Sequence, residues 1–390
     1  MITSIHIQNF KSHKYTQLKL GSLTILCGAN GVGKSSIFQS LLLLRQTHQK
    51  NRLLSVLSLN KPLCYIGKGK DALYQFAETD KISIGLESTG KKLKWIFDTE
   101  KHSESDFLEI TKDTDDEVAT ETRNMLAHNK LQSSLFEKSF QFISAARISK
   151  YESDDYAVDI EKQISIEEGK AELTAQFLFK YRDEQVSSEL LHPKNKNDIG
   201  LLAQTIAWEK EISKGVSIEP IQIGTNYDIL YSFEIEGGVR STNKFTSKNV
   251  GFGLSYALPI IVAVLSAPKG SLILIENPEA HLHPAAQSKL AELLCLAAQS
   301  GVQVILETHS DHVVNGTMVQ CKYFETKGTG IDKNNVKIFY FDKDEQNKTV
   351  RTTEVELKDG GRIKKAPPGF FDQMGKDLRV LMGTSANRNE

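Results

Sequence analysis

The sequence predicts an α/β fold, in which a mixed β-sheet is combined with an inserted helical segment and a small C-terminal cap. Three stretches support this prediction, because each contains a continuous apolar run of the kind found in buried strands. They lie at residues 24–28, 271–279 and 301–310. The first ends in a glycine-rich turn, the second in carboxylates and the third in a histidine, so polar groups follow each predicted strand.

Composition and charge are those of an ordinary globular protein. The chain has 390 residues, a net charge of -1 and 39% hydrophobic residues, enough for one large core or two smaller ones. The near-zero charge gives no global argument for nucleic-acid binding, although basic stretches at 91–94 and 362–365 leave local contacts open. The four cysteines are scattered without a C-x-x-C pair, which is typical of buried thiols in a reducing compartment.

The N-terminus and the apolar segments indicate a cytoplasmic protein. The first ten residues alternate apolar and polar side chains and lack the basic and apolar regions of a signal peptide. The longest apolar candidates, 41–44 and 257–265, are too short to span a bilayer. We therefore expect a cytoplasmic location and no membrane partner.

The stretch TILCGANGVGKSS, residues 24–36, contains the phosphate-binding pattern G-x-x-x-x-G-K-[ST] between a predicted strand and a predicted helix. Glycines allow the loop to turn its backbone N–H groups toward phosphate oxygens. We therefore predict a site for ATP and Mg²⁺, in which Lys34 contacts the β- and γ-phosphates and Ser35 contacts the metal. The predicted nucleotide-binding residues here are Asn30, Gly31, Val32, Gly33, Lys34, Ser35 and Ser36.

Carboxylates follow the second buried strand, as in the Walker B segment of an ATPase. Glu276 lies at the carboxyl end of this predicted strand, where α/β sheets bind ligands, so we predict that it holds Mg²⁺ with Ser35. The next residue is Asn277, where ABC ATPases typically have the glutamate that activates water. Because an amide cannot accept a proton as a general base, either hydrolysis is slow or Glu279 substitutes.

Five stretches resemble known ATPases. IQNFKSHKYTQLKLGSLTILCGANGVGKSS at the N-terminus resembles the ATPase heads of the SMC, RecF and OLD families. VGFGLSYALPIIV, IENPEAHLHPAAQ, ETHSDHVVN and the tail APPGFFDQMGKDLRVLM are similar to a bacterial group of stand-alone ABC-type AAA ATPases. Members of that group end in a small domain of uncharacterised function, and they include the Septu-type ATPases of anti-phage defence.

This resemblance implies an ABC-type head with P-loop, Walker B and switch-histidine elements. In such heads a signature loop closes over the γ-phosphate held by a partner, which implies nucleotide contacts from Gly251, Phe252, Gly253 and Ser255. The catalytic or sensing residues implied are Glu276, Glu279 and His309, with His309 in the place of the switch histidine. Residues 11 and 12 correspond to positions near the adenine and ribose. His281 and His283 are better explained as residues of the loop that leads into the next helix than as metal ligands.

We predict four segments along the chain. Residues 1–100 form the N-terminal part of the head with the P-loop, 101–225 an inserted variable segment, 226–330 the C-terminal part of the head, and 331–390 a small C-terminal domain. The insert should contain helices at 167–181 and 198–214, followed by paired strands at 218–223 and 229–235. Residues 339–357 read as a hairpin rather than as the start of a Toprim nuclease.

The function that the resemblance implies is an ATPase subunit that dimerises around ATP and Mg²⁺ and regulates an effector in anti-phage defence. The expected partners are a second copy, in a homodimer or a larger homo-oligomer, and a protein such as an HNH nuclease. Two alternatives stay open. One is a nucleotide sensor or scaffold with little hydrolysis, which Asn277 favours. The other is a DNA-repair or chromosome-associated ATPase of the RecF or SMC kind, which the missing coiled coil disfavours.

Overall fold

The structure is a computed structural model that describes residues 1–51, 54–88, 90–111, 115–128, 133–147, 151–235 and 240–382. Its described strands form two six-stranded sheets, a four-stranded sheet and a two-stranded pair. In the described part of the chain, no helix is both long enough and apolar enough to cross a membrane.

The central six-stranded sheet, in the order β16-β15-β3-β14-β13-β8, contains the three buried runs predicted from the sequence. The strands from β15 to β8 are parallel, and β16 is antiparallel to β15. All residues of β3, β13 and β14 are buried except the last residue of β3 and of β13, as expected for strands covered on both faces. The bounds are β3 Leu23–Gly28, β8 Gln141–Ile143, β13 Leu272–Glu276, β14 Gln303–Thr308, β15 Val336–Asp344 and β16 Thr349–Glu354.

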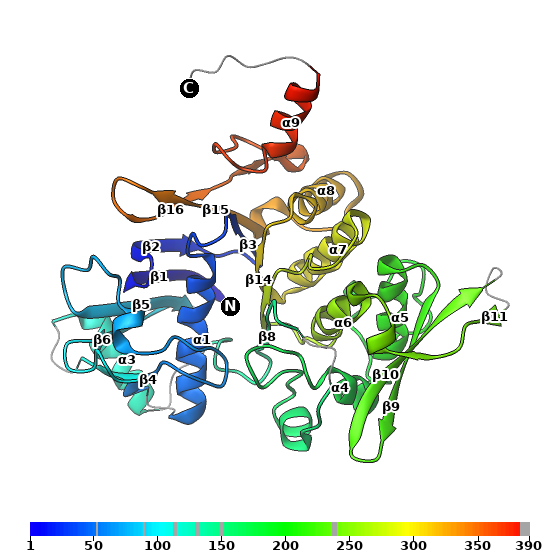
Figure 1. Cartoon of the computed structure of the whole chain (residues 1–390), viewed down its shortest axis with the longest axis horizontal. Coiled ribbons are helices and arrows are strands. Elements are labelled where there is room, and N and C mark those ends of the chain that lie inside the picture. The colour runs from blue at the N-terminus through cyan, green and yellow to red at the C-terminus, as the bar shows by residue number, and fades with distance from the viewer. Residues whose placement is uncertain are drawn as a thin grey trace.

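Helices cover both faces of this sheet. Figure 1 shows α1 on one side and α6, α7 and α8 on the other. Side chains of β3 alternate between the two layers, because successive residues of a strand point to opposite faces. Ile25 belongs to the core cluster that includes α6 and α7, whereas Leu26 belongs to the cluster that includes α1. The bounds are α1 Lys34–Lys50, α6 Phe252–Leu265, α7 Pro284–Ser300 and α8 Asp311–Lys327.

The other six-stranded sheet is antiparallel, with the order β2-β1-β5-β6-β7-β4. It shares the second core cluster with α1, and this cluster includes Trp95 and Phe97 of the sheet and Phe38 and Leu41 of α1. The bounds are β1 Ile2–Phe10, β2 His13–Lys19, β4 Val56–Ser58, α2 Gly69–Ala72, β5 Lys81–Ser88, β6 Lys91–Asp98, β7 Phe107–Ile110 and α3 Glu117–Ala127.

The segment between β8 and α6 combines helices with a long hairpin. The paired strands predicted from the sequence are confirmed, since β9 and β10 are antiparallel. The helix predicted at 167–181 is wrong in its first half. Glu168, Gly169 and Ala171 have positive φ values of 48°, 70° and 62°, which no right-handed helix contains. The bounds are η1 Tyr156–Ile160, α4 Thr174–Tyr181, η2 Ser188–Leu190, α5 Leu201–Ile212, β9 Val216–Ile223, β10 Asn226–Ile235, β11 Arg240–Ser241, β12 Phe245–Thr246 and η4 Ser247–Asn249.

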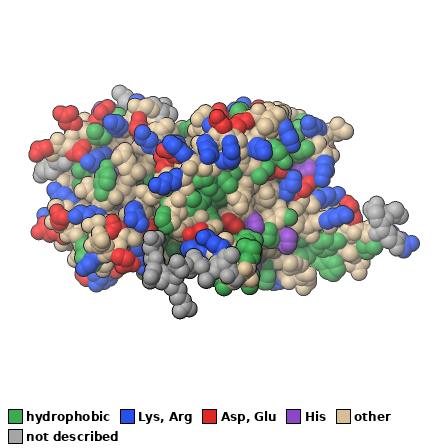
Figure 2. All heavy atoms as spheres, turned by 90° about the horizontal axis from the view of Figure 1, so that it is seen from above, with side chains coloured by type: hydrophobic (Ala, Val, Ile, Leu, Met, Phe, Trp, Pro, Cys, Tyr) green, Lys and Arg blue, Asp and Glu red, His purple; other side chains and the backbone are tan. Residues whose placement is uncertain are grey.

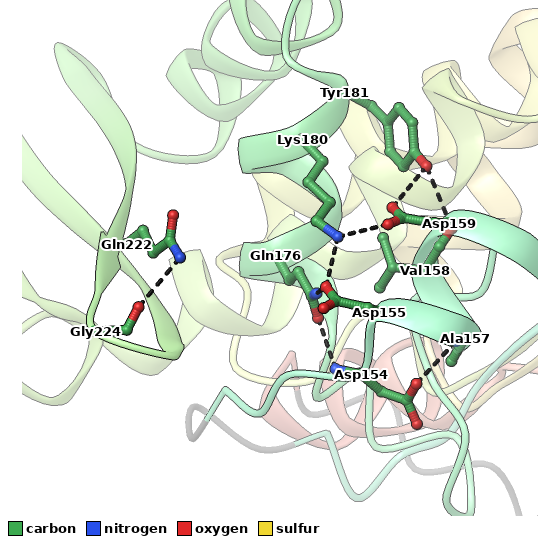
Figure 3. Close-up of polar contacts among 10 residues, drawn as sticks. All are labelled: Asp154, Asp155, Ala157, Val158, Asp159, Gln176, Lys180, Tyr181, Gln222 and Gly224. Carbon is green, nitrogen blue, oxygen red and sulfur yellow. Dashed lines mark hydrogen bonds and ion pairs between the residues drawn. The ribbon is translucent and has the colours of Figure 1, made fainter.

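Polar contacts join α4 to the short helix η1 (Figure 3). Lys180 Nζ lies 2.6 Å from Asp155 Oδ1 and 2.7 Å from Asp159 Oδ2, and Tyr181 donates its hydroxyl to Asp159 at 3.1 Å. Gln176 donates to the same Asp155 Oδ1 at 2.8 Å. One helix face is therefore fixed on the other by charge-assisted hydrogen bonds.

The C-terminal part begins inside the central sheet. The hairpin predicted at 339–357 is confirmed, because β15 and β16 are antiparallel with Phe339 opposite Glu354. The boundary at residue 331 stays a prediction, and both strands of this hairpin belong to the sheet that holds β3. The remaining bounds are η5 Lys333–Asn335, β17 Leu357–Lys358, η6 Asp359–Gly361, β18 Arg362–Ile363 and α9 Gln373–Leu381.

Helix α9 projects from the top of the molecule, and none of its residues is buried (Figure 1). Met374 and Leu381 are 68% and 81% exposed. Figure 2 looks onto the side of the molecule that includes α9 and shows hydrophobic side chains there beside Lys and Arg side chains.

Candidate functional site

The loop between β3 and α1 has the backbone conformation expected of a phosphate-binding loop. Gly28, Gly31 and Gly33 have positive φ values of 143°, 72° and 92°. Gly33 is the N-cap of α1, so the first N–H groups of the helix, before Ser36 whose N–H donates to the Gly33 carbonyl at 3.0 Å, have no intrahelical partner and can bind an anion. Of the predicted loop residues, the exposed ones are Asn30, Gly31 and Ser35, the half-buried one is Gly33, and the buried ones are Val32, Lys34 and Ser36.

Lys34 lies beside a carboxylate that the sequence analysis did not identify. Its Nζ donates to the carbonyl oxygens of Gly28 at 3.1 Å and Ala29 at 2.7 Å, and lies 3.7 Å from Glu307 Oε1. Ser35 donates its hydroxyl to the same carboxylate oxygen at 3.1 Å. Burial lowers the pKa of Lys34, while the charge of Glu307 acts to raise it. Glu307 therefore joins the two side chains predicted to hold phosphate and metal.

Glu307 also lies next to the predicted metal ligand Glu276, because β13 and β14 are parallel and the two residues are register partners. The second carboxylate oxygen, Glu307 Oε2, is buried and has no hydrogen-bond partner among the described residues. The same is true of Asn277 Oδ1. Buried acceptors without a donor suit a cation or an ordered water.

The two neighbouring carboxylates fit Mg²⁺, which nucleotide sites usually bind through one or two carboxylates together with phosphates and waters. The donors would be Ser35 Oγ, Glu276 and Glu307. In the described part of the chain, no group of three or more His, Cys, Asp or Glu side chains could hold an ion.

A backbone hydrogen bond holds the carboxylate of Glu276 in place. Its Oε2 accepts a hydrogen bond from the backbone N–H of Ala145 at 3.0 Å. Burial raises the pKa of Glu276 and the charge of Glu307 adds to this effect, whereas the Ala145 hydrogen bond and Arg147 favour the charged form. A bound cation would favour the charged form further.

Arg147, shortly after the end of β8, fixes the backbone at the end of β13. Its Nη1 donates to the carbonyl oxygens of Ser144 at 2.7 Å and Glu276 at 2.8 Å, and its Nη2 donates to that of Asn277 at 2.9 Å. Asn277 has a positive φ of 44°, which costs free energy for a residue with a side chain. The guanidinium therefore helps to hold Asn277 in this left-handed conformation, which asparagine adopts more readily than most residues.

Aromatic contacts connect Arg147 with the predicted signature loop. The guanidinium carbon lies 5.3 Å from the centre of the Tyr256 ring. The ring centroids of Tyr256 and His281 are 4.6 Å apart, and those of His281 and Phe252 are 5.4 Å apart. The predicted Walker B end and the start of α6 thus belong to one packed group. Neither His281 nor His283 takes part in a described metal-ligand cluster.

The predicted signature residues form the start of α6. Gly251 is the N-cap and is exposed, and Phe252 is 64% exposed. Gly253 packs against His281, since a Cβ atom there would lie 2.9 Å from the His281 carbonyl oxygen. Ser255 is 3% exposed and donates its hydroxyl to the Phe252 carbonyl at 3.1 Å. The groups that this loop offers outward are therefore the backbone at Gly251 and the ring of Phe252.

Glu279 and His309 are brought together by a tight set of hydrogen bonds. Thr308 donates its hydroxyl to Glu279 Oε2 at 2.7 Å, and the backbone N–H of His309 donates to Glu279 Oε1 at 2.8 Å. Both oxygens of Glu279 are thus engaged in holding the end of β14. The His309 side chain is exposed and lines the cavity next to the P-loop.

A cavity of about 660 Å³ lies over the P-loop. Lys34, Ser35, Glu307 and His309 line it, together with residues of the β1–β2 turn and of the C-terminal hairpin. Among the residues that line it are Lys11, Ser12, Gln39, Tyr74, Gln75 and Lys348. Among the described residues, Glu276, Glu279 and the four signature-loop residues are not part of this lining.

The buried side chain of His13 contacts the backbone of the P-loop. His13 Nε2 lies 2.9 Å from the Gly33 carbonyl oxygen, which can only accept, so Nε2 carries the proton. Nδ1 then accepts from the Thr16 hydroxyl at 2.7 Å. Burial lowers the pKa of His13 to about 4, so the ring is neutral near pH 7.

We expect His13 to make stability depend on pH. Its folded pKa of about 4 lies below the value of 6.5 expected when unfolded, so the unfolded chain binds the proton more readily between these values. The free energy of unfolding should therefore fall as pH falls through this range, by about 2 kcal/mol between pH 7 and pH 5 from this residue.

Urea unfolding of the parent and of His13→Gln at the two pH values measures this contribution. The glutamine amide can still donate to the Gly33 carbonyl but does not titrate. The parent should lose about 2 kcal/mol more than the variant. Equal losses in the two proteins would show that His13 titrates normally in the folded state.

Comparison with known proteins places the chain among ATPases. Residues 23–315 match the family model described as "AAA domain, putative AbiEii toxin, Type IV TA system". Residues 331–381 match a second model, described as a protein of unknown function. No curated protein matches the sequence.

Among the solved structures with a similar fold are two SMC heads. One is an SMC head bound to the C-winged-helix domain of ScpA; it is 13% identical, with a TM-score of 0.52 over 91% of this chain and 98% of that one. The other is the Pyrococcus furiosus SMC head with an extended coiled coil, bound to the C-terminal domain of ScpA; it is 12% identical, with a TM-score of 0.51 over 98% of both chains. At this identity the likeness concerns the fold alone, and it confirms the predicted mixed α/β ATPase-head fold.

Proposed function

The chain belongs to the family described as AAA domain, putative AbiEii toxin, Type IV TA system, and from this premise we propose that it is a slow ABC-type ATPase. In this proposal it binds ATP with Mg²⁺, closes as a homodimer around the nucleotide and thereby regulates an effector protein. The observation that supports it most is the group formed by Lys34, Ser35 and Glu307 at a cavity of about 660 Å³.

The P-loop binds the phosphate chain. Backbone N–H groups of the loop and of the first turn of α1 donate to phosphate oxygens, and Lys34 supplies a point charge. Ser35, Glu276 and Glu307 would hold Mg²⁺, and the ion would supply positive charge that offsets the negative charge of the phosphates. Because Lys34 is buried at 2% exposure, its charge acts in a poorly hydrated site where Coulomb attraction is strong.

Hydrolysis is expected to be slow because of Asn277. Its side-chain oxygen can accept a hydrogen bond and so orient a water, but it cannot take the proton. Glu279 uses both carboxylate oxygens to hold Thr308 and His309. We therefore assign Glu279 to positioning His309 at the cavity, in agreement with a sensing role for the pair.

The position of the predicted signature loop supports the proposed dimer. Gly251 and Phe252 are exposed and lie outside the described lining of the cavity in their own chain. A second copy facing the first would place this loop over the nucleotide of its partner. ATP would then connect two protomers, and its loss would release them.

The role in anti-phage defence is the most specific part of the proposal. It is supported by the resemblance to Septu-type ATPases and by the toxin named in the family description. The effector that fits this role is a nuclease such as an HNH enzyme, in the cytoplasm. A nucleotide sensor with almost no hydrolysis is the second candidate, and the observation that favours it is Asn277.

Light scattering of the purified chain tests the dimer. We expect the mass to double from 43.6 kDa when ATP and Mg²⁺ are added, and Phe252→Asp to prevent this by placing a charge on the facing loop. Phe245→Asp is the matched control, since Phe245 is also an exposed phenylalanine, at 37%, but lies in β12. A parent that stays monomeric while it binds ATP would contradict head-to-head closure.

A further inference from the structure

The C-terminal hairpin contributes a wall of the cavity over the P-loop. Lys348 lies at the turn between β15 and β16 and lines the same cavity as Lys34 and Ser35. It has a positive φ of 54°, a conformation that costs free energy for a lysine unless its surroundings fix it. The matched family model describes residues 331–381 only as a protein of unknown function.

Aromatic residues fix this turn from one side. Tyr74 is 2% exposed and its hydroxyl lies 3.1 Å from the Lys348 carbonyl oxygen and 3.4 Å from that of Asn347. The Lys348 ammonium lies 4.9 Å from the centre of the Phe76 ring, a cation–π distance. The backbone of the turn and the lysine side chain are therefore both held next to the cavity.

The same hairpin touches the P-loop and the turn beside it. Val350 donates its backbone N–H to the Ser12 carbonyl at 3.3 Å, and the Thr349 hydroxyl donates to that carbonyl at 3.2 Å. A Cβ atom at Gly33 would lie only 2.9 Å from Val350 Cγ2. Strand β16 is thus in van der Waals contact with the glycine that caps α1.

Lys348 differs from Lys11 and Lys70, which also line the cavity, in the groups that its ammonium contacts. Lys11 donates to Gln39 at 2.9 Å, and Lys70 is paired with Glu104 at 2.7 Å. As far as the structure describes the chain, Lys348 has no carboxylate within ion-pair distance. A cation held on an aromatic ring beside an anion-binding cavity is available for an anionic ligand.

We propose that Lys348 binds the phosphate chain of the nucleotide, so that the C-terminal hairpin is part of the ATP site. This inference rests on the proposed ATP binding and extends it to the segment of unknown function. The ligand is a nucleoside triphosphate or diphosphate, recognised by its negative charge. Nucleotide then fixes the hairpin against the P-loop, and the hairpin leads through residues 355–372 to α9.

The test compares ATP affinity in three full-length variants. Lys348→Met keeps the apolar stem and removes the charge, and Lys348→Arg keeps the charge. Lys343→Met removes a charge from the same hairpin at an exposed position outside the cavity lining. We expect Lys348→Met to weaken ATP binding about tenfold, with Lys348→Arg near the parent and Lys343→Met unchanged.

Salt dependence and hydrogen exchange complete the test. ATP affinity of Lys348→Met should depend less on ionic strength than that of the parent. ATP should slow amide exchange at residues 345–350 in the parent but not in Lys348→Met. If the parent binds no ATP, the proposed function itself fails. If the parent binds ATP and Lys348→Met binds it as tightly as Lys343→Met, the proposed role of Lys348 is overturned.

Discussion

Glu307→Gln is expected to lower ATP turnover about 100-fold or more, because it removes a carboxylate from the charge balance of Lys34 and Mg²⁺. The amide keeps the shape of the side chain and can still accept from Ser35, whose hydroxyl lies 3.1 Å from Glu307 Oε1. Its charge is lost beside Lys34 Nζ, which is 3.7 Å away. The buried acceptor Glu307 Oε2 is replaced as well.

The same variant should lose most of the Mg²⁺ dependence of ATP affinity, which is a readout independent of turnover. Affinity measured by calorimetry with and without Mg²⁺ gives this dependence, and Mn²⁺ bound in the presence of ATP can be counted by electron paramagnetic resonance. Glu121→Gln is the control, because Glu121 is exposed on α3. A Glu307→Gln protein with parental turnover and parental Mg²⁺ dependence would remove Glu307 from the site.

Gly33→Ala is expected to destabilise the protein by about 3 to 5 kcal/mol. The φ of 92° at Gly33 is unfavourable for alanine. The new Cβ atom would also lie 2.5 Å from Ser12 Oγ, 2.8 Å from His13 Nε2 and 2.9 Å from Val350 Cγ2. Two segments that are far apart in the sequence, the β1–β2 turn and β16, would have to move away from the P-loop.

Gly31→Ala provides the matched control for this effect. Gly31 has a similar φ of 72°, but a Cβ atom there would meet nothing within 4 Å. We expect it to cost only about 1 kcal/mol, the strain of the backbone alone. Denaturant unfolding without nucleotide separates the two variants. Equal losses of stability would show that β16 and the β1–β2 turn do not pack on the P-loop as described.

The parts of the site that the sequence predicted are those with a local pattern. The P-loop could be predicted because glycine spacing, lysine and serine all lie within one short stretch, 28–36. The strand ends at Glu276 and His309 could be predicted because a buried apolar run precedes each of them. These patterns say which residue types lie at one sheet edge, but not which of them touch.

The residues that were missed depend on tertiary contacts. Glu307 joins Ser35 only through the pairing of β14 with β3 and β13, although its place at the end of a buried strand was a usable signal. His13 and Lys348 come from a turn and a hairpin at opposite ends of the chain. Nothing near Arg147 in the sequence indicates the carbonyl groups that its guanidinium binds.

The measurement that most directly tests the central claim is release of phosphate from ATP by the purified full-length chain with Mg²⁺, in parallel with Lys34→Ala. We predict slow but measurable turnover, below about 1 per second, and none above background for Lys34→Ala. Turnover that is the same in both proteins would show that this site does not cleave ATP. ATP binding without any phosphate release by the parent would contradict hydrolysis and leave the nucleotide sensor as the function.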